Sequence, residues 1–418
     1  MSSTSVPAAS CPFDHTASQP DQNVRKTSVQ PVTSEPRVFV DDHGVWQIRG
    51  FDECRQILRG DTTKQAGFGA EQVSLAAGRM REPILYLEGE HHHQLRSQTA
   101  KFFTPTTTKT QHRAVMERLT NQLIERLEKN GRADLSELSL ELAVGVAAHV
   151  IGLTRSNIKG LARRIGSLAF NPTTANPFQR RWNATIGAPL NLLAFYLFDV
   201  RPAMAASRQA TAQKLPQDNV VSHVMKLGYK SHEVLGECVT YGAAGMLTTR
   251  EFISITIWHL LERPVLRARY LVAEEPERHA ILGEILRLEP VIGTIKRRAT
   301  AAIQLSVGQV THEIPSGALI HLHVYDANAD TKTVNENPHD LCPMRPLPRS
   351  VQEPVLSFGD GHHRCPGSFI AFAETDIFLL RLLPLPVKLV SKPTLRFNPT
   401  IDGYEIRNLQ LQLTGATA

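Results

Sequence analysis

The chain has 418 residues, of which 42% are hydrophobic and 21% are charged. This length and composition are typical of a globular protein with a large core, and they exclude a disordered or fibrous chain. The net charge is +6, from 46 Lys and Arg and 40 Asp and Glu. No dense basic run is interleaved with aromatic residues, so nothing requires nucleic-acid binding. A basic docking face for an acidic protein partner is equally compatible with this charge.

The five cysteines are far apart, with no CxxC pair and no spacing typical of a disulfide framework. They favour reduced thiols and a cytoplasmic location. Residues 1–36 are rich in Ser, Thr, Pro and Gln and contain no apolar run of the kind found in a signal peptide or membrane anchor. We therefore expect a flexible N-terminal tail over residues 1–36, followed by a single domain over residues 37–418.

The first predicted elements are a hairpin over residues 37–50, in which two β-type runs flank Asp-Asp-His-Gly, and a helix over residues 51–60. Residues 61–78 have mixed polarity and several glycines, and we expect mostly loop there. From residue 90 to residue 274 nearly every segment has helical periodicity. The first third of the chain thus changes from β-type to helical patterning.

The longest predicted helix begins at Ser231, as N-cap, and continues until Pro264 ends it. At 1.5 Å per residue it is roughly 50 Å long, enough to cross a whole domain. Its middle, "GAAGMLTT", contains two glycines and two threonines and is a poor helix former. A kinked or opening turn there indicates a functional position.

After this helix the pattern predicts another helix over residues 276–290 and strand alternation over residues 302–330, with a Pro-Ser-Gly turn. An apolar helix over residues 368–383 and strands near "PVKLV" and "EIRNLQLQL" complete the chain. There is no internal repeat and no linker after the tail. The sequence predicts a mainly α fold with small β-sheets.

Residues 358–367, "FGDGHHRCPG", raise the question of what the thiol of Cys365 is for. A structural zinc site needs four N or S ligands, and this segment has no second cysteine nearby. A catalytic nucleophile, which needs a partner base and an oxyanion hole, stays open. The glycines permit tight turns and let a flat ligand approach the main chain. Cys365 also lies just ahead of a helix expected to begin near Pro366, where a thiol pKa is lowered toward thiolate.

A thiolate held against a flat ligand is a haem-thiolate site, and the segment closely resembles the signature of the cytochrome P450 family, Phe-Gly-x-Gly-x-His-x-Cys-x-Gly. The resemblance extends from about Val38 to the C-terminus. It implies the family's triangular helical prism, a haem-thiolate monooxygenase domain with haem b between the long helix and the cysteine loop. Cys365 would then be the axial ligand of the iron. The matching positions are Phe358, Gly359, Gly361, His363, Cys365 and Gly367.

Glu284 and Arg287 match the family's Glu-x-x-Arg pair, which braces the fold beneath the haem. By itself, such a pair at i, i+3 is usually a solvated salt bridge worth a few tenths of a kcal/mol. Its position ahead of the cysteine loop favours the family role.

The segment "EGEHHHQLR" resembles the family's acidic-Gly-x-x-His-x-x-x-Arg segment, which implies that His92 and Arg96 reach a haem propionate. Arg297 matches the arginine that pairs with the propionates through charge-assisted hydrogen bonds, and His363 adds another donor. The alternative for residues 91–93, three consecutive histidines, is a metal site or simple surface. Neighbouring helix positions diverge by about 100°, so the three cannot chelate one ion together.

The segment "AAGMLTT" resembles the family's oxygen-binding groove. Ala244 and Gly245 would make room over the iron, and the hydroxyl of Thr248 would hydrogen-bond dioxygen. The alternative is that these small residues serve only helix packing. The family usually carries Asp or Glu just before this threonine, whereas this chain has Leu247. Glu251, one turn beyond Leu247 on the same face, is a hypothetical substitute that acts through water.

The resemblance implies monooxygenation of a small, largely apolar substrate, such as one of secondary metabolism. It also implies that electrons from NAD(P)H arrive through a separate ferredoxin or flavodoxin and its reductase, with Arg364 among the docking contacts. We expect a cytoplasmic monomer. The alternatives are a peroxide-using or oxidatively coupling enzyme, suggested by Leu247, and a haem protein that senses or carries a ligand.

Residues 169–178, "AFNPTTANPF", are a candidate lid over the pocket entrance. The substrate itself is not fixed by the sequence, because the family draws its pocket from variable loops on a shared scaffold. The candidate substrate-lining residues are Phe68, Ala243, Ala244, Val291, Ile292, Thr294 and Ile295.

Overall fold

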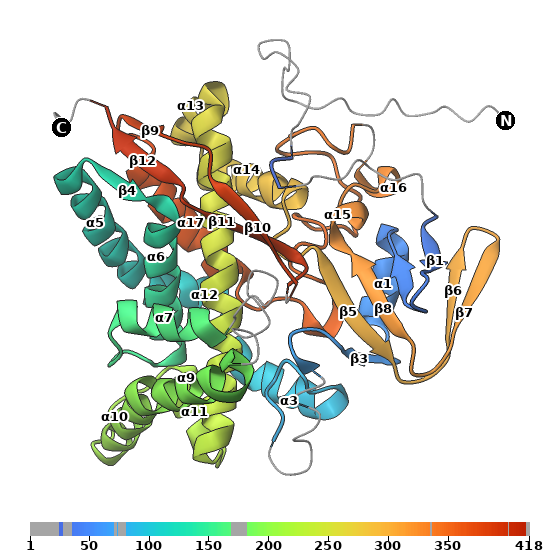
Figure 1. Ribbon diagram of the computed structural model, residues 1–418, viewed down its shortest axis with the longest axis horizontal. Coiled ribbons are helices and arrows are strands. Elements are labelled where there is room, and N and C mark those ends of the chain that lie inside the picture. Colours follow the sequence, from blue (N-terminus) through green and yellow to red (C-terminus); the bar gives the residue numbers. More distant parts are fainter. Residues whose placement is uncertain are drawn as a thin grey trace. The chain divides into compact units, whose positions relative to one another are not determined.

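The computed structural model describes residues 25–27, 36–70, 73, 81–168, 182–334, 337–399 and 401–414. Helices dominate and the strands form small sheets, which confirms the predicted fold class (Figure 1). Contacts divide the chain into two compact units. The first contains residues 1–66 and 263–365, and the second contains residues 67–262 and 366–418. The single domain expected over residues 37–418 stays a prediction.

The first unit is built on a five-stranded sheet with the strand order β1-β2-β8-β5-β3. β2 pairs in parallel with β8, and the other neighbours pair antiparallel. The predicted hairpin is confirmed as β1 paired with β2, and the Pro-Ser-Gly turn lies between β7 and β8. The strands are β1 (Val38–Val40), β2 (Trp46–Ile48), β3 (Thr63–Gln65), β5 (Thr294–Ala299), β8 (Leu319–His323) and the separate hairpin of β6 (Ile303–Val307) and β7 (Val310–Ile314).

β3 is a difference from the sequence prediction, which expected mostly loop over residues 61–78. Its three residues pair with β5, with Thr63 opposite Ala299 and Gln65 opposite Arg297. A strand this short and polar has no hydrophobic alternation to detect. Its stability comes from β5, a partner far away in the sequence.

Helix α1 (Phe51–Arg59), as predicted, lies over the core of the first unit. Its residues Phe51, Cys54 and Ile57 are buried together with Ile48 and Ile320 of the sheet. This spacing places the apolar side chains on one helical face. The other helices of the unit are α13 (Pro264–Val272), α14 (Glu275–Leu288), α15 (Val324–Ala327), α16 (Thr331–Val334) and the 3₁₀ turn η6 (Gly361–His363).

A short part of the predicted tail contacts the first unit. The backbone N–H of Lys26 and the hydroxyl of Thr27 donate to the carboxylate of Glu289, and Arg25 donates to the carbonyl oxygen of Tyr325 at 2.9 Å. These three residues are therefore held in place by specific contacts. Apart from them and Pro36, the tail lies outside the described residues.

The second unit is mainly helical, as predicted for residues 90–274. Its helices are α3 (Gly89–Ala100), α4 (Pro105–Thr107), α5 (Arg113–Asn130), α6 (Leu135–Ile151), α7 (Ile158–Leu168), α9 (Ala188–Phe195), α10 (Arg201–Ala212), α11 (Val220–Lys226), α12 (Ser231–Glu262) and α17 (Ser368–Leu382), with π-helical segments η2 (Thr108–His112), η4 (Asn183–Gly187) and η5 (Tyr196–Val200). Its small sheets are β4 (Arg132–Asp134), β12 (Gln410–Leu413) and β9 (Val387–Leu389), and the pair β10 (Thr394–Asn398) and β11 (Gly403–Arg407).

Helix α12 confirms the longest predicted helix and continues without a break through "GAAGMLTT". Its N-cap is Lys230 rather than Ser231, because the carbonyl oxygen of Lys230 accepts from the N–H of Val234 and its own N–H donates to the carboxylate of Glu233 at 2.7 Å. α6 packs along α12. None of the helices in the described parts of the chain combines the length and apolar composition needed to cross a membrane.

Candidate functional site

The cysteine loop, residues 358–367, is shaped by backbone hydrogen bonds and two left-handed glycines. The N–H of Cys365 donates to the carbonyl oxygen of Phe358 at 2.8 Å, which closes the loop. Gly359 and Gly361 have φ of +70° and +65°, which favour glycine. A Cβ on Gly361 would lie 2.1 Å from the carbonyl oxygen of Leu58 in α1. The packing of the loop on α1 therefore requires glycine at this position.

The thiol of Cys365 differs from the other free thiols. Cys54 and Cys238 are fully buried, and burial raises the pKa of both. Cys365 is partly exposed, so it is the accessible free thiol among the described residues. Cys342 is disulfide-bonded, which corrects the expectation of reduced thiols throughout; spacing along a sequence does not report distance in a fold. α17 begins at Ser368, slightly later than expected.

The Glu284–Arg287 pair in α14 is deeply buried. Two parallel contacts of 2.7 and 2.8 Å join the guanidinium to the carboxylate, and both side chains are only 2% exposed. Arg287 also donates to the carbonyl oxygens of Asn328, Pro338 and Asp340. The alternative of a solvated salt bridge is therefore wrong, since the pair connects α14 to the segments that follow α15.

A second arginine completes this cluster. Arg345 lies 3.3 Å from a carboxylate oxygen of Glu284, and the N–H of Cys342 donates to the same oxygen at 2.9 Å. Arg345 also donates to the carbonyl oxygens of Val334 and Asn337. One buried carboxylate therefore organises a long stretch without regular secondary structure.

Arg297, in β5, is buried and held by β3. Its guanidinium donates to the hydroxyl and carbonyl oxygens of Thr63, at 3.1 and 3.0 Å, and to the side-chain oxygen of Gln65 at 3.2 Å. These bonds fix the orientation of the positive charge. Thr63 and Gln65 were not predictable as partners of Arg297, because their contribution depends on the pairing of β3 with β5. His363 lies in η6 and is partly exposed.

The three consecutive histidines of α3 differ in their exposure to solvent. His92 is buried, whereas His91 and His93 are exposed. Arg96 lies one turn beyond His92, at i, i+4, as predicted. Among the described residues no group of three or more His, Cys, Asp or Glu side chains is arranged to hold a metal ion. The contacts of His92 and Arg96 with a propionate stay predictions.

The centre of α12 contains the three small residues predicted to lie over the iron. The hydroxyl of Thr248 donates to the carbonyl oxygen of Ala244 at 2.5 Å. A Cβ on Gly245 would lie 3.5 Å from the Cβ of Ala147 in α6, an ordinary van der Waals contact, so helix packing does not by itself require glycine here. Ala244 is exposed and Leu247 is partly buried. Packing alone therefore does not account for Ala244.

The carboxylate of Glu251 is buried, and both of its oxygens accept hydrogen bonds. Its carboxylate is 1% exposed and contacts the guanidinium groups of Arg250 and Arg407, at 2.7 and 2.8 Å. It also accepts from the N–H of Ile406 at 2.7 Å. These contacts attach α12 to β11. They favour a structural role for Glu251 over the hypothetical proton relay, because both carboxylate oxygens already accept hydrogen bonds from these partners.

The candidate substrate-lining residues occupy different environments. Phe68 has a left-handed backbone, with φ of +56°, and its carbonyl oxygen accepts from the hydroxyl of Tyr86 at 2.6 Å. In the first unit, Ile295 lies against the cysteine loop, since a Cβ on Gly359 would be 3.9 Å from its Cδ1. The candidate lid, residues 169–178, lies outside the described residues. Val291 is buried, whereas Ala243, Ile292 and Thr294 are partly exposed.

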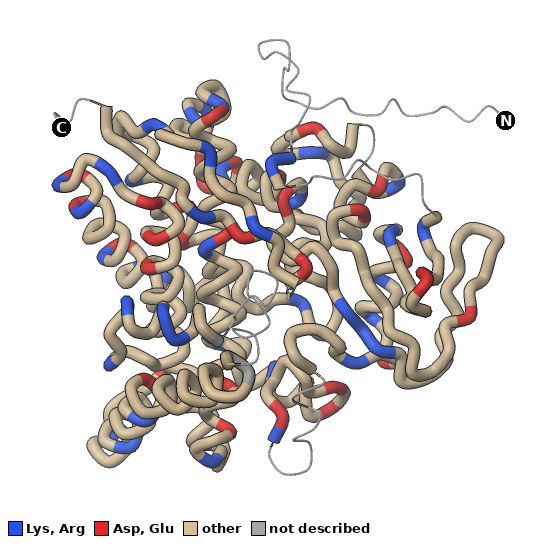
Figure 2. The backbone as a smooth tube through the Cα atoms, in the orientation of Figure 1, with Lys and Arg blue, Asp and Glu red and all other residues tan. Residues whose placement is uncertain are grey.

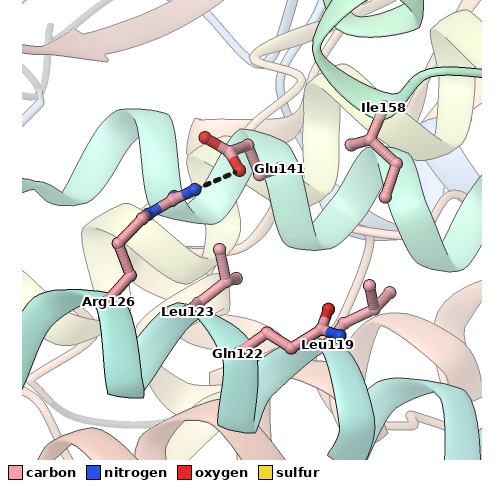
Figure 3. A pocket seen from close by; sticks show the side chains of 6 residues that line it. All are labelled: Leu119, Gln122, Leu123, Arg126, Glu141 and Ile158. Atoms are coloured by element: carbon pink, nitrogen blue, oxygen red, sulfur yellow. Dashed lines mark hydrogen bonds and ion pairs between the residues drawn. The ribbon is translucent and has the colours of Figure 1, made fainter.

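A cavity of about 90 Å³ lies between α5, α6 and α7 of the second unit (Figure 3). An ion pair of 2.8 Å between Arg126 and Glu141 crosses it. The cavity contains none of the predicted site residues and is too small for an organic substrate. Its lining residues are Leu119, Gln122, Leu123, Arg126, Glu141 and Ile158.

Comparison with known proteins is consistent with the cysteine loop. The profile of the Cytochrome P450 family matches residues 278–385. The Biotin biosynthesis cytochrome P450 of Bacillus subtilis (strain 168) is 27% identical, over 81% of this chain and 82% of the relative. Erythromycin C-12 hydroxylase of Saccharopolyspora erythraea is 24% identical, over 83% of each chain. The crystal structure of the enzyme CYP109B1 from Bacillus subtilis has a TM-score of 0.73 and 20% identity, over 90% of this chain and 96% of that structure.

The mainly helical fold and the glycine-shaped cysteine loop are consistent with a haem-thiolate oxidoreductase. The family profile, the relatives and the fold agree in their similarity to cytochrome P450 proteins. This similarity supports an oxidoreductase of the P450 monooxygenase class, with haem iron as its cofactor.

Proposed function

We propose that this enzyme inserts one atom of dioxygen into a small, largely apolar substrate of secondary metabolism, while the other atom leaves as water. The cysteine loop is the observation that carries the proposal. Its backbone is fixed by Gly359 and Gly361, and it carries the accessible thiol of Cys365. Haem iron held by the Cys365 thiolate would supply the dioxygen chemistry, because the sulfur would donate electron density to the iron.

The side chains proposed to hold haem b fit its chemistry. A thiolate suits iron, glycine permits the close approach of a flat ring, and arginine and histidine suit two propionates. Arg297 supports this assignment most directly, because β3 already fixes its guanidinium. The proposed contacts are Cys365 as the axial ligand, His92, Arg96, Arg297 and His363 toward the propionates, and Phe358, Gly359 and Gly367 in the loop.

Thr248 is proposed to position dioxygen and to hold a proton at Oγ1. Its hydroxyl hydrogen is directed to the carbonyl oxygen of Ala244, so both lone pairs of Oγ1 are available to accept a hydrogen bond. The small side chain of Ala244 and the glycine at position 245 leave room beside it. These features support an oxygen-binding role for this turn of α12.

The proposed substrate contacts come from both the helical and the β-type segments. Val291, Ile292, Thr294 and Ile295 precede or begin β5, and Ala243 lies in α12. Phe68 is a further candidate. Mostly apolar side chains with few polar groups suit a largely apolar substrate.

The electrons are proposed to come from NAD(P)H through a reductase and a ferredoxin or flavodoxin. Lys and Arg are mixed with Asp and Glu along the described chain (Figure 2), so a docking contact depends on local charge. Arg364, in the cysteine loop, is the proposed contact, and its guanidinium donates to the side chain of Gln352. We also propose that the enzyme is a cytoplasmic monomer.

A second candidate function rests on Leu247. Reduction of dioxygen consumes protons, and a leucine cannot relay them. A peroxide-using or oxidatively coupling enzyme avoids part of this requirement. Product formation with hydrogen peroxide that matches or exceeds formation with dioxygen and a surrogate electron-transfer system would favour this candidate.

The Glu251→Gln variant separates the two roles considered for this side chain. We expect stability to fall by about 1–3 kcal/mol, because Arg250 and Arg407 lose a buried carboxylate partner. Coupling of electron consumption to product should stay unchanged. Denaturant unfolding and product yield per NAD(P)H measure the two effects. A loss of coupling at unchanged stability would instead support a relay.

A ferric absorption titration tests the proposed function. Steroids, terpenoids, fatty acids, aromatics and cyclic dipeptides are titrated into the holoenzyme, because a fitting molecule that displaces water from the iron shifts its spin state. We expect a shift confined to one class, followed by an oxygenated product of that compound. A thiolate spectrum with no shift and no product from any class would contradict the proposal and favour a sensor or carrier.

A further inference from the structure

Glu237, in the N-terminal half of α12, is a buried acid that the proposed function does not use. Its side chain is 1% exposed, and Oε1 accepts from the N–H of Ile84 at 3.1 Å. Oε2 is buried and makes no hydrogen bond within the described parts of the chain. Burial raises the pKa of the carboxyl to about 8, although the Ile84 bond opposes this shift. Glu237 therefore holds a proton at neutral pH.

Tyr241 lies one turn further along the helix. Its hydroxyl is buried and, among the described residues, forms no hydrogen bond of normal geometry. The ring stacks on Phe103 with centroids 5.7 Å apart and an angle of 10°. Burial and then Glu237 raise the pKa of this hydroxyl, while Thr99 and Arg96 oppose the shift. The Tyr241 hydroxyl therefore stays protonated, and stacking on Phe103 fixes the orientation of the ring.

The groups around Glu237 preserve its neutral form. Tyr229, Cys238 and Tyr241 interact with it electrostatically, and none of them supplies a positive charge. Arg81, in the segment before Ile84, pairs with Glu233 instead. Among the described residues the carboxyl is therefore a proton donor without a competing salt bridge.

Helical geometry places Glu237 on the same face of α12 as Thr248. At 100° per residue, the directions of Glu237, Tyr241 and Thr248 fall within about 40° of one another. The distance along the axis is roughly 6 Å from Glu237 to Tyr241 and roughly 10 Å from Tyr241 to Thr248. The positions between the last two on this face are Ala244 and Gly245. Ala244 is small and exposed, so water can approach the helix at this position.

We propose that Glu237 and Tyr241 store protons and pass them to Thr248, in place of the acid that Leu247 replaces. This inference rests on the proposed function. The proton on Oε2 of Glu237 moves through a bridging water to the Tyr241 oxygen, whose own proton moves through water to Oγ1 of Thr248. Thr248 releases its proton to the dioxygen being reduced. Each hydroxyl gains and loses one proton, and the Glu237 carboxylate regains one from solvent at the start of α12.

Glu237→Gln is the decisive variant, because glutamine keeps an acceptor for the Ile84 N–H but has no acidic proton. Glu233→Gln is the matched control. Its carboxylate lies one turn earlier and also accepts backbone N–H groups, from Lys230 and Arg81. Although burial opposes it, these bonds lower the pKa of Glu233, so this acid is ionised. Tyr241→Phe removes the hydroxyl and keeps the stacking on Phe103.

Two measurements on the holoenzymes test the proposal. Infrared difference spectra over a pH titration should show a protonated carboxylic acid that titrates near pH 8 in the wild type and in Glu233→Gln, and is missing from Glu237→Gln. Coupling of electrons to product should fall by roughly tenfold or more in Glu237→Gln and Tyr241→Phe, with an increased solvent isotope effect. Glu233→Gln should match the wild type.

The outcomes separate this inference from the proposed function. Absence of the acid band from the wild type at neutral pH overturns the relay alone. Equal coupling of electrons to product in Glu237→Gln and Glu233→Gln also overturns the relay, because the buried acid would then have only a structural role. A wild type with a thiolate spectrum but no turnover of any substrate overturns the proposed function, and the relay with it.

Discussion

Replacement of Cys365 with serine is expected to abolish the thiolate signature in the ferrous–carbon monoxide absorption spectrum while the fold is retained. Serine has nearly the same shape, and the bond from the N–H at position 365 to the carbonyl oxygen of Phe358 persists. A hydroxyl does not supply the electron density of a thiolate. Oxygenation should therefore fall roughly a hundredfold or more, a barrier increase of at least about 2.7 kcal/mol.

Cys54→Ala is the control for this variant. Cys54 is a free thiol of the same unit, but it is buried in the core and its Sγ lies 3.5 Å from the carbonyl oxygen of Ile48. Its loss should lower stability by about 1 kcal/mol and leave the spectrum unchanged. A thiolate signature that survives in Cys365→Ser would contradict the assignment of this residue as the iron ligand.

Local patterns predicted most of the elements. The hairpin of β1 and β2, helix α1 and helix α12 follow from alternation, helical periodicity and the position of Pro264. β3 was not predictable, because three polar residues carry no periodic signal. Its stability depends on pairing with β5, which lies more than two hundred residues later in the chain.

The same distinction applies to the candidate site. The glycines of the cysteine loop were interpretable from sequence because a left-handed φ is a local property. The partners of Glu251, Arg407 and the N–H of Ile406, come from a strand near the C-terminus. No local pattern reports such a contact. The buried acid Glu237 was missed for the same reason, since its environment includes the distant segment of Ile84.

Arg287→Met is expected to reduce the free energy of unfolding by about 3–5 kcal/mol, the second large effect. Methionine has a similar volume, so the main loss is electrostatic. Glu284 would remain buried and charged, with Arg345 as its remaining cation in the cluster. The carbonyl oxygens that Arg287 now serves would lose a donor as well. Denaturant unfolding of the holoenzyme measures the change.

An exposed pair of the same chain supplies the comparison. Arg113 and Glu117 in α5 are also joined at 2.8 Å, but their side chains are 47% and 42% exposed. Arg113→Met should therefore cost only a few tenths of a kcal/mol. The double variant Glu284→Gln/Arg287→Met should recover part of the loss, because no uncompensated charge remains. If Arg287→Met and Arg113→Met lost the same free energy of unfolding, the Glu284–Arg287 pair would act as a solvated salt bridge. Recovery of stability in the double variant would show that the pair acts as a buried one.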